Sequence, residues 1–125
     1  MALLKGNASE ITIPVKAVFT HDGAEREVAF TVAYKRRTRE EQIAQAEYID
    51  AEDLDGFARA STRLARSKEI LRQIITGWRD LRGADGEEIP FSLEVLDEML
   101  ADDDYYDALV SGLTESTLPK ARRKN

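Results

Sequence analysis

The carboxylates are the side chains whose number and spacing most suggest chemistry in this chain. Ten Asp or Glu residues, and no Lys or Arg, lie between residues 85 and 107. Paired carboxylates can hydrolyse a glycosidic bond or bind a hard cation. A calcium loop, however, alternates its ligands, turns at a glycine and ends on a glutamate. Neither residues 85–88 nor residues 102–104 have that spacing, and nothing in the sequence selects one pair for hydrolysis.

Other catalytic side chains are scarce. The chain has no cysteine, which excludes disulfides, thiolate zinc sites and cysteine nucleophiles. Its only histidine, His21, falls in a predicted turn, where we expect a solvated loop residue. The sequence contains no glycine-rich phosphate loop and no arrangement of Ser, His and Asp that suggests a triad. We therefore expect no enzyme activity, no metal and no cofactor.

Basic side chains gather in three places. Each is either a docking site for an acidic partner or an ordinary solvated surface, and the sequence leaves both readings open. They are a junction cluster of Lys35, Arg36, Arg37 and Arg39, a ridge of Arg59, Arg63 and Arg66, and a tail with Lys120, Arg122, Arg123 and Lys124. A net charge of -6 argues against nucleic-acid binding as the main activity, since polyphosphate is repelled by an acidic field.

The elements that position these side chains belong to one domain, because 125 residues can bury a single modest core. The chain is 42% hydrophobic and 34% charged, a typical globular balance. No apolar run approaches the ~20 residues that cross a bilayer. The apolar run near Met1 is too short for a signal peptide. We expect a cytoplasmic protein with no membrane partner.

Alternating apolar residues predict an antiparallel hairpin over residues 11–36. The period of two runs on both sides of Asp22-Gly23, a strong hairpin turn signal. Pro14 has no backbone donor and therefore marks the first strand as an edge or a bulge. The apolar residues are Ile11, Ile13, Val15, Ala17 and Phe19 in the first strand and Val28, Phe30, Val32 and Tyr34 in the second. Because two strands are marginal alone, helices must cover this face.

Helical signals follow the hairpin. Thr38 and Glu41 form a capping box that starts a short helix, with Ile43, Ala46 and Ile49 facing inward. A main helix is predicted over about residues 55–80. Its apolar stripe, weakest at Ser67 and Lys68, comprises Phe57, Ala60, Leu64, Leu71, Ile74 and Trp78.

Two further helices complete the predicted domain. Ser92 caps the first of them, whose apolar face holds Leu93, Leu96, Met99 and Leu100. The carboxylates of residues 102–104 suit the start of the second, which we expect to end near Gly112. The fold class is therefore α+β, with an N-terminal antiparallel β-hairpin packed against about four C-terminal α-helices. We place the domain at residues 11–113 (hairpin 11–36, helical part 38–113), between flexible segments at 1–10 and 114–125.

One stretch resembles a known family. An apolar helix is followed by Gly77-Trp78, an acidic turn at Asp85-Gly86-Glu87, then Ile89-Pro90-Phe91-Ser92, and finally Leu93, Leu96 and Leu100. This order, over about residues 70–112, resembles the small tail assembly chaperones of long-tailed (siphovirus-type) phages and prophages. None of the motif residues carries out chemistry. Trp78, Phe91 and Leu96 are interpreted as structural anchors.

The resemblance implies a non-enzymatic chaperone. Such a protein would bind the tape measure protein, keep it soluble, help recruit tail tube subunits, and be absent from the mature virion. A groove between apolar helix faces can shield an amphipathic helix, and an acidic surface keeps the complex soluble. Our candidate docking residues lie on the last helix, which has the least chain left to cover it; the alternative is that they close the core. They are Tyr105, Tyr106, Leu109 and Leu113.

The family also suggests a second gene product. Many of its genes carry a slippery heptamer near the stop codon, and Leu118-Pro119-Lys120 permits the pattern C-CCA-AAR. The expectation is a longer protein that branches at Lys120; a gene without the heptamer there would contradict it.

Two other functions stay open beside the chaperone. One is a nucleic-acid-binding regulator that uses Arg36, Arg37, Arg39 or the tail. The other is a structural tail component that remains in the virion. Self-association is compatible with all three.

Overall fold

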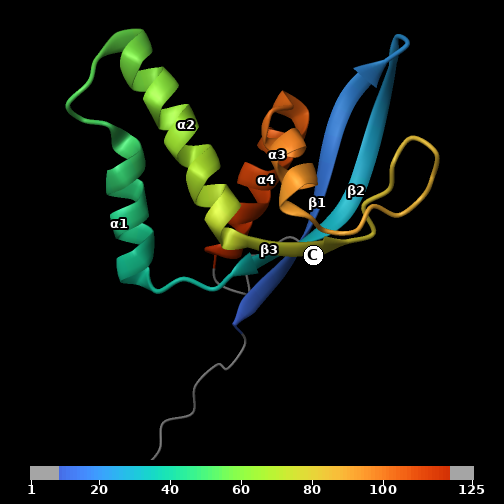
Figure 1. The fold of residues 1–125 in the computed structure, drawn as a ribbon, viewed down its shortest axis with the longest axis horizontal. Coiled ribbons are helices and arrows are strands. Elements are labelled where there is room, and N and C mark those ends of the chain that lie inside the picture. Colours follow the sequence, from blue (N-terminus) through green and yellow to red (C-terminus); the bar gives the residue numbers. More distant parts are fainter. Residues whose placement is uncertain (1–8, 119–125) are drawn as a thin grey trace, which may run out of the picture.

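A three-stranded antiparallel sheet and four helices make up residues 9–118, the part of the chain that the computed structural model describes (Figure 1). The sheet has the order β1-β2-β3. The strands are β1 (Glu10–His21), β2 (Ala24–Lys35) and β3 (Ile75–Arg79). The helices are α1 (Arg39–Asp50), α2 (Gly56–Ile74), α3 (Leu93–Leu100) and α4 (Asp103–Ser116). The prediction of an α+β fold with an N-terminal hairpin and about four helices is confirmed.

The hairpin forms as its alternation predicts. Asp22 and Gly23 connect the strands with φ of 52° and 76°, the positive values that a type I′ turn needs. β1 lies at an edge of the sheet, where Pro14 is tolerated. One face of the hairpin is buried and holds Ile13, Val15, Ala17, Phe30, Val32 and Tyr34.

Helix α4 crosses this buried face at Gly112. A Cβ atom on Gly112 would lie 2.6 Å from Val15 Cγ1 and closer still to the Tyr34 hydroxyl. The Tyr34 hydroxyl donates a hydrogen bond of 2.8 Å to the Leu109 carbonyl oxygen, one helical turn earlier. Gly112 therefore lets helix and sheet approach closely.

The expected helix end near Gly112 is wrong, because α4 continues to Ser116. Thr114, Glu115 and Ser116 consequently belong to the helix and not to a flexible tail. The rest of the predicted flexible segments falls partly outside the described residues: 1–8 at the N-terminus and 119–125, with most of the basic tail, at the C-terminus.

The predicted main helix is too long, because α2 ends at Ile74 and the chain enters β3 directly. Ile74, Ile75 and Thr76 are three consecutive β-branched residues, which favour strand over helix, and Gly77 weakens a helix further. β3 pairs with β2, placing Val32 opposite Trp78. Trp78 therefore lies on a strand and not on the helical stripe.

Trp78, on β3, connects the loop between β3 and α3 to the sheet. Its indole Nε1 donates a hydrogen bond of 2.8 Å to the Ile89 carbonyl oxygen. Its ring meets Phe91 edge-on, with ring centroids 4.7 Å apart. Leu96, the third predicted anchor, is fully buried in the core below α3. All three residues thus hold the loop and α3 against the sheet.

Three of the four helix starts carry a side-chain cap, and the exception is α2, whose N-cap residue Asp55 makes no side-chain capping bond. The Thr38 side chain accepts from the Glu41 amide and the Glu41 carboxylate accepts from the Thr38 amide, completing the capping box. Ser92 Oγ accepts from the Val95 amide at 3.1 Å, and Asp102 Oδ1 accepts from two amides of α4.

Two expected inward faces are wrong. Ile43 and Ala46 are exposed and Ile49 is only half-buried, because α1 packs beside α2 and not over the sheet. Leu93 is also exposed, since α3 buries Leu96, Met99 and Leu100 instead.

Candidate protein-binding surfaces

The arginine ridge of α2 faces α1. Arg59 donates to the Asp50 carboxylate at 3.0 Å and to the Asp50 carbonyl oxygen at 3.1 Å. Arg66 donates to the Tyr48 carbonyl oxygen at 2.8 Å and lies 4.8 Å from the Tyr48 ring centroid. The hydrogen bond from Arg59 also holds the pKa of Asp50 below its usual value. Two of the three predicted ridge residues therefore hold α1, and only Arg63 is exposed. The prediction that all three arginines form a docking ridge is therefore wrong for Arg59 and Arg66, which bind α1.

These arginine contacts matter because α1 has no buried residue of its own. We expect the double substitution Arg59→Ala and Arg66→Ala to release α1 while leaving global stability nearly unchanged, since solvent-exposed ion pairs and hydrogen bonds contribute little. Amide hydrogen exchange would report faster exchange over α1 and unchanged exchange over β1 and β2. Equal protection of α1 in the variant and the parent chain would contradict this role.

The apolar stripe of α2 is covered along only part of its length. Phe57, Ala60, Leu64 and Leu71 fall within roughly 60° of one another around the helix. Leu71 is 1% exposed, whereas Leu64 is 45% and Phe57 88% exposed. We call Phe57, Ala60 and Leu64 the α2 strip; Ala60 is exposed as well. An almost bare phenylalanine in continuation of a buried stripe is a feature of interaction surfaces.

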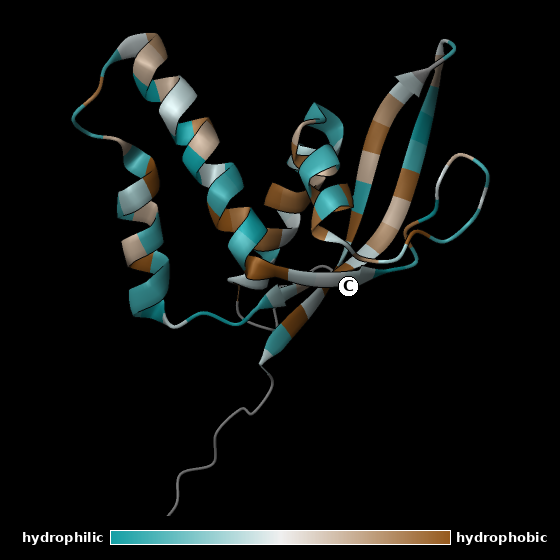
Figure 2. Cartoon of the chain, in the orientation of Figure 1, coloured by the Kyte–Doolittle hydropathy of each residue, from teal (hydrophilic) through white to brown (hydrophobic). Residues whose placement is uncertain are grey.

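The α2 strip is exposed because the core of the domain covers only the C-terminal end of α2. The buried residues of α2 are Ile70, Leu71 and Ile74, all in its last two turns. Figure 1 shows that the opposite end of α2 extends away from the sheet with only α1 beside it. Arg59 and Arg66 turn toward α1, so the α2 strip lies on the side of α2 that α1 does not cover. Figure 2 shows apolar residues along α2 on both its covered and its uncovered half.

The predicted docking residues on α4 are largely part of the core. Leu109 is 0% exposed and cannot contact a partner in this fold, which corrects the prediction. Tyr105 lies between Phe19 and Phe30, with ring centroids 6.2 and 6.3 Å away. Tyr106 is half-buried beneath Lys68, whose Nζ is 5.7 Å from the ring centroid. Leu113 is half-buried against the same core.

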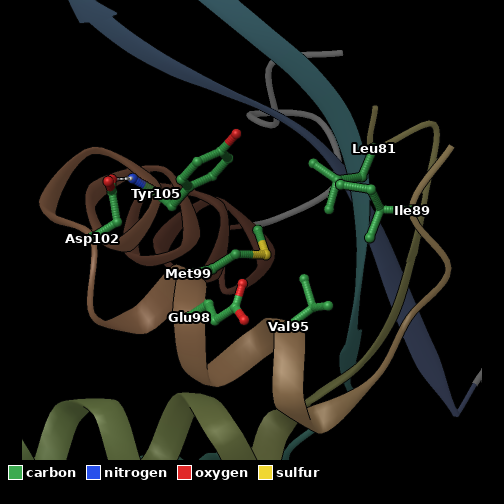
Figure 3. Close-up of a pocket in the computed structure, with 7 residues that line it drawn as sticks. All are labelled: Leu81, Ile89, Val95, Glu98, Met99, Asp102 and Tyr105. Atoms are coloured by element: carbon green, nitrogen blue, oxygen red, sulfur yellow. Dashed lines mark hydrogen bonds between the residues drawn. The ribbon is translucent and has the colours of Figure 1, made fainter. Parts of the chain in front are cut away.

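A pocket of about 240 Å³ lies where α3 and α4 meet the loop after β3 (Figure 3). Tyr105 is the only predicted docking residue that reaches it. Burial raises the pKa of the Tyr105 hydroxyl, and the nearby negative charge of Asp102 raises it further. The residues that line the pocket are the apolar Leu81, Ile89, Val95, Met99 and Tyr105 and the acidic Glu98 and Asp102.

Within residues 9–118, no group of three or more His, Cys, Asp or Glu side chains is placed to hold a metal ion. No helix in that same part of the chain is both long and apolar enough to cross a membrane. The side chain of His21 lies outside the described part of the structure. In the basic junction cluster, Arg37 donates to Gln45 Oε1 at 2.7 Å and supports α1.

Sequence reasoning missed the α2 strip because it counted the whole stripe as core. The sequence does contain one indication of the strip. The apolar stripe is weakest at Ser67 and Lys68, and the covered and uncovered halves of α2 meet at these residues. No protein-family model, no curated protein and no solved structure matches this chain.

Proposed function

We propose that this chain is a non-enzymatic phage tail assembly chaperone that binds the tape measure protein in the bacterial cytoplasm and keeps it soluble during tail assembly. The observation that supports the proposal most is the α2 strip, in which Phe57 is 88% exposed. The motif between residues 70 and 112 supports the family. Recruitment of tail tube subunits and absence from the mature virion belong to the same proposal.

The α2 strip supplies a physical mechanism. A tape measure protein is long and largely helical, and its amphipathic helices aggregate when their apolar faces are open. The α2 strip can pack against such a face as one helix packs against another. Burying Phe57 and the exposed half of Leu64 would contribute about 3 kcal/mol in total. The surplus of acidic residues in the chain would keep the resulting complex soluble.

The function is tested by co-expression with the large helical protein encoded downstream. We expect that protein to become soluble and to copurify with this chain. A downstream protein that stays insoluble with this chain, and with any frameshifted form of it, would overturn the chaperone proposal. Mass spectrometry of purified phage particles tests the proposed absence from the mature virion. Detection of this chain in virions would favour a structural tail component.

The double substitution Phe57→Asp and Leu64→Asp tests the docking surface. We expect about a hundredfold weaker binding of the tape measure protein, which corresponds to about 3 kcal/mol, and a nearly unchanged melting temperature. Leu93→Asp is the control for one of these two added charges, because it places a single aspartate on an exposed leucine of α3 outside the α2 strip. Binding is measured by titration of a labelled tape measure fragment. Equal losses in both variants would exclude the α2 strip as the docking surface.

A further inference from the structure

The pocket beside α3 shares no residue with the α2 strip and has a different chemical character. Leu81 and Ile89 form one wall from the loop after β3, and Val95 and Met99 form another from α3 (Figure 3). The backbone bond from the Ile89 amide to the Leu81 carbonyl oxygen, at 2.7 Å, joins the two loop residues. The Trp78 indole also donates a hydrogen bond to the Ile89 carbonyl oxygen. These bonds give the pocket a fixed apolar wall before any ligand arrives.

The size of the pocket limits what it can bind. Its volume of about 240 Å³ is below the ~300–1,000 Å³ that drug-sized ligands and cofactors usually occupy. A single Leu, Met or Phe side chain of a partner would fit inside it. Protein interfaces commonly use one such buried anchor within a polar rim.

The rim of the pocket is negative. Glu98 and Asp102 lie beside the apolar walls. Asp102 Oδ1 already accepts from two amides of α4, whereas no hydrogen bond or ion pair of Glu98 occurs within residues 9–118. The surrounding residues 85–107 contain no Lys or Arg, and the ion pair that α3 makes with α2, from Arg72 to Asp97 at 2.8 Å, does not include Glu98. A bound segment therefore gains most if it brings a cation to Glu98.

We propose that this acidic pocket binds an amphipathic helical segment of a partner protein, taking one apolar side chain into the cavity and one Lys or Arg, a helical turn away, against Glu98. The spacing follows from the helix, in which residues three or four apart share a face. The inference does not rest on the chaperone function, because any partner with this chemistry would satisfy it. It assigns to Glu98, within the acidic run of residues 85–107, a role in recognition.

Methyl NMR gives a direct test, because the chain has two methionines, Met1 and Met99, and Met99 lines the pocket. The probe is a synthetic helical peptide with a Leu anchor and a Lys four residues later; its partner peptide carries Glu in place of Lys. With ¹³C-methyl methionine in the full chain, we expect the Lys peptide to shift the Met99 resonance saturably. The Glu peptide should bind about tenfold more weakly. No shift with the Lys peptide, or equal shifts with both peptides, would overturn the proposal.

Charge substitutions on the protein complete the test. Glu98→Lys is expected to weaken binding of the Lys peptide by about tenfold or more, and Glu98→Gln by less. Asp107→Lys is the matched control, since it makes the same charge change at an exposed position of α4 outside the pocket. Thermal unfolding checks that all three variants fold. Equal affinities in Glu98→Lys and Asp107→Lys would contradict a role for Glu98.

Two other occupants have distinct signatures in the same spectra. If the chain's own basic residues 119–125 fill the pocket, a chain that stops at Leu118 will shift the Met99 resonance without any peptide. If a second copy fills it, the Met99 resonance will change on dilution of the protein alone. Either result would replace the partner helix as the occupant.

Discussion

Gly112→Ala is expected to destabilise the protein by about 3 kcal/mol, the upper end of the usual cost of overpacking a core. The added methyl group would lie 2.6 Å from Val15 Cγ1 and nearer still to the Tyr34 hydroxyl. Neither neighbour can move aside easily. Val15 belongs to the β-sheet, and Tyr34 is 1% exposed and hydrogen-bonded to Leu109. Relief would require α4 to lift from the sheet, which would open the main core.

The sign of this effect makes the experiment decisive. In an ordinary helix, Gly→Ala stabilises by ~1 kcal/mol, because glycine has the larger entropy in the unfolded chain. Ser111→Ala is the control, since it alters the exposed neighbour on the same helix and should change stability by less than ~0.5 kcal/mol. Urea unfolding measures all three proteins. A Gly112→Ala variant as stable as the parent would show that α4 does not approach the sheet this closely.

Above pH 10 we expect stability to fall steeply because of Tyr34. Burial raises the pKa of the Tyr34 hydroxyl above its ordinary value of 10.0. The folded state therefore holds its proton more tightly than the unfolded state does. Its contribution to stability is complete below pH 10 and is lost as the pH rises toward the folded pKa. The loss from this one group is about 1.4 kcal/mol per pH unit over that range.

Tyr34→Phe isolates this contribution. At neutral pH the variant should lose about 1 kcal/mol with the hydrogen bond to the Leu109 carbonyl oxygen. Between pH 10 and 11 its stability should then decline less steeply than that of the parent chain. Tyr106→Phe controls for the removal of one tyrosine. Urea unfolding at several pH values gives the slopes, and parallel declines in Tyr34→Phe and the parent would contradict the assignment.

The parts of the fold that the sequence predicts well depend on neighbours in the chain. The Asp22-Gly23 turn needs only two residues that accept positive φ, and the alternation around it identifies the buried face. Thr38, Ser92 and Asp102 cap their helices through amides two or three residues away. Such signals are complete within a short window, so the α+β class and the starts of α1, α3 and α4 follow from them.

The errors concern residues whose role is set by distant partners. Gly112 suggests a helix end when it is considered alone, but Tyr34 and Val15 require a glycine inside the helix. Residues 75–79 continue a helical stripe, yet the edge of β2 pairs with them as a strand. The α2 strip and the acidic pocket escaped prediction for the same reason. Which apolar residues remain uncovered depends on how far α3, α4 and the loop extend over the core.

The packing of α4 on β1 has a consequence for synthesis of the chain. β1 ends at residue 21 and α4 begins at residue 103, so about 80 residues separate the sheet face from the helix that covers it. At ~5–20 residues per second, a ribosome needs roughly 4–16 s for that interval. Once β2 has been synthesised within that interval, the nascent hairpin presents Ile13, Val15 and Phe30 without α4. Translation that stops before residue 103 would leave this face bare, whereas any product that diverges after Ser116 would carry the complete cover.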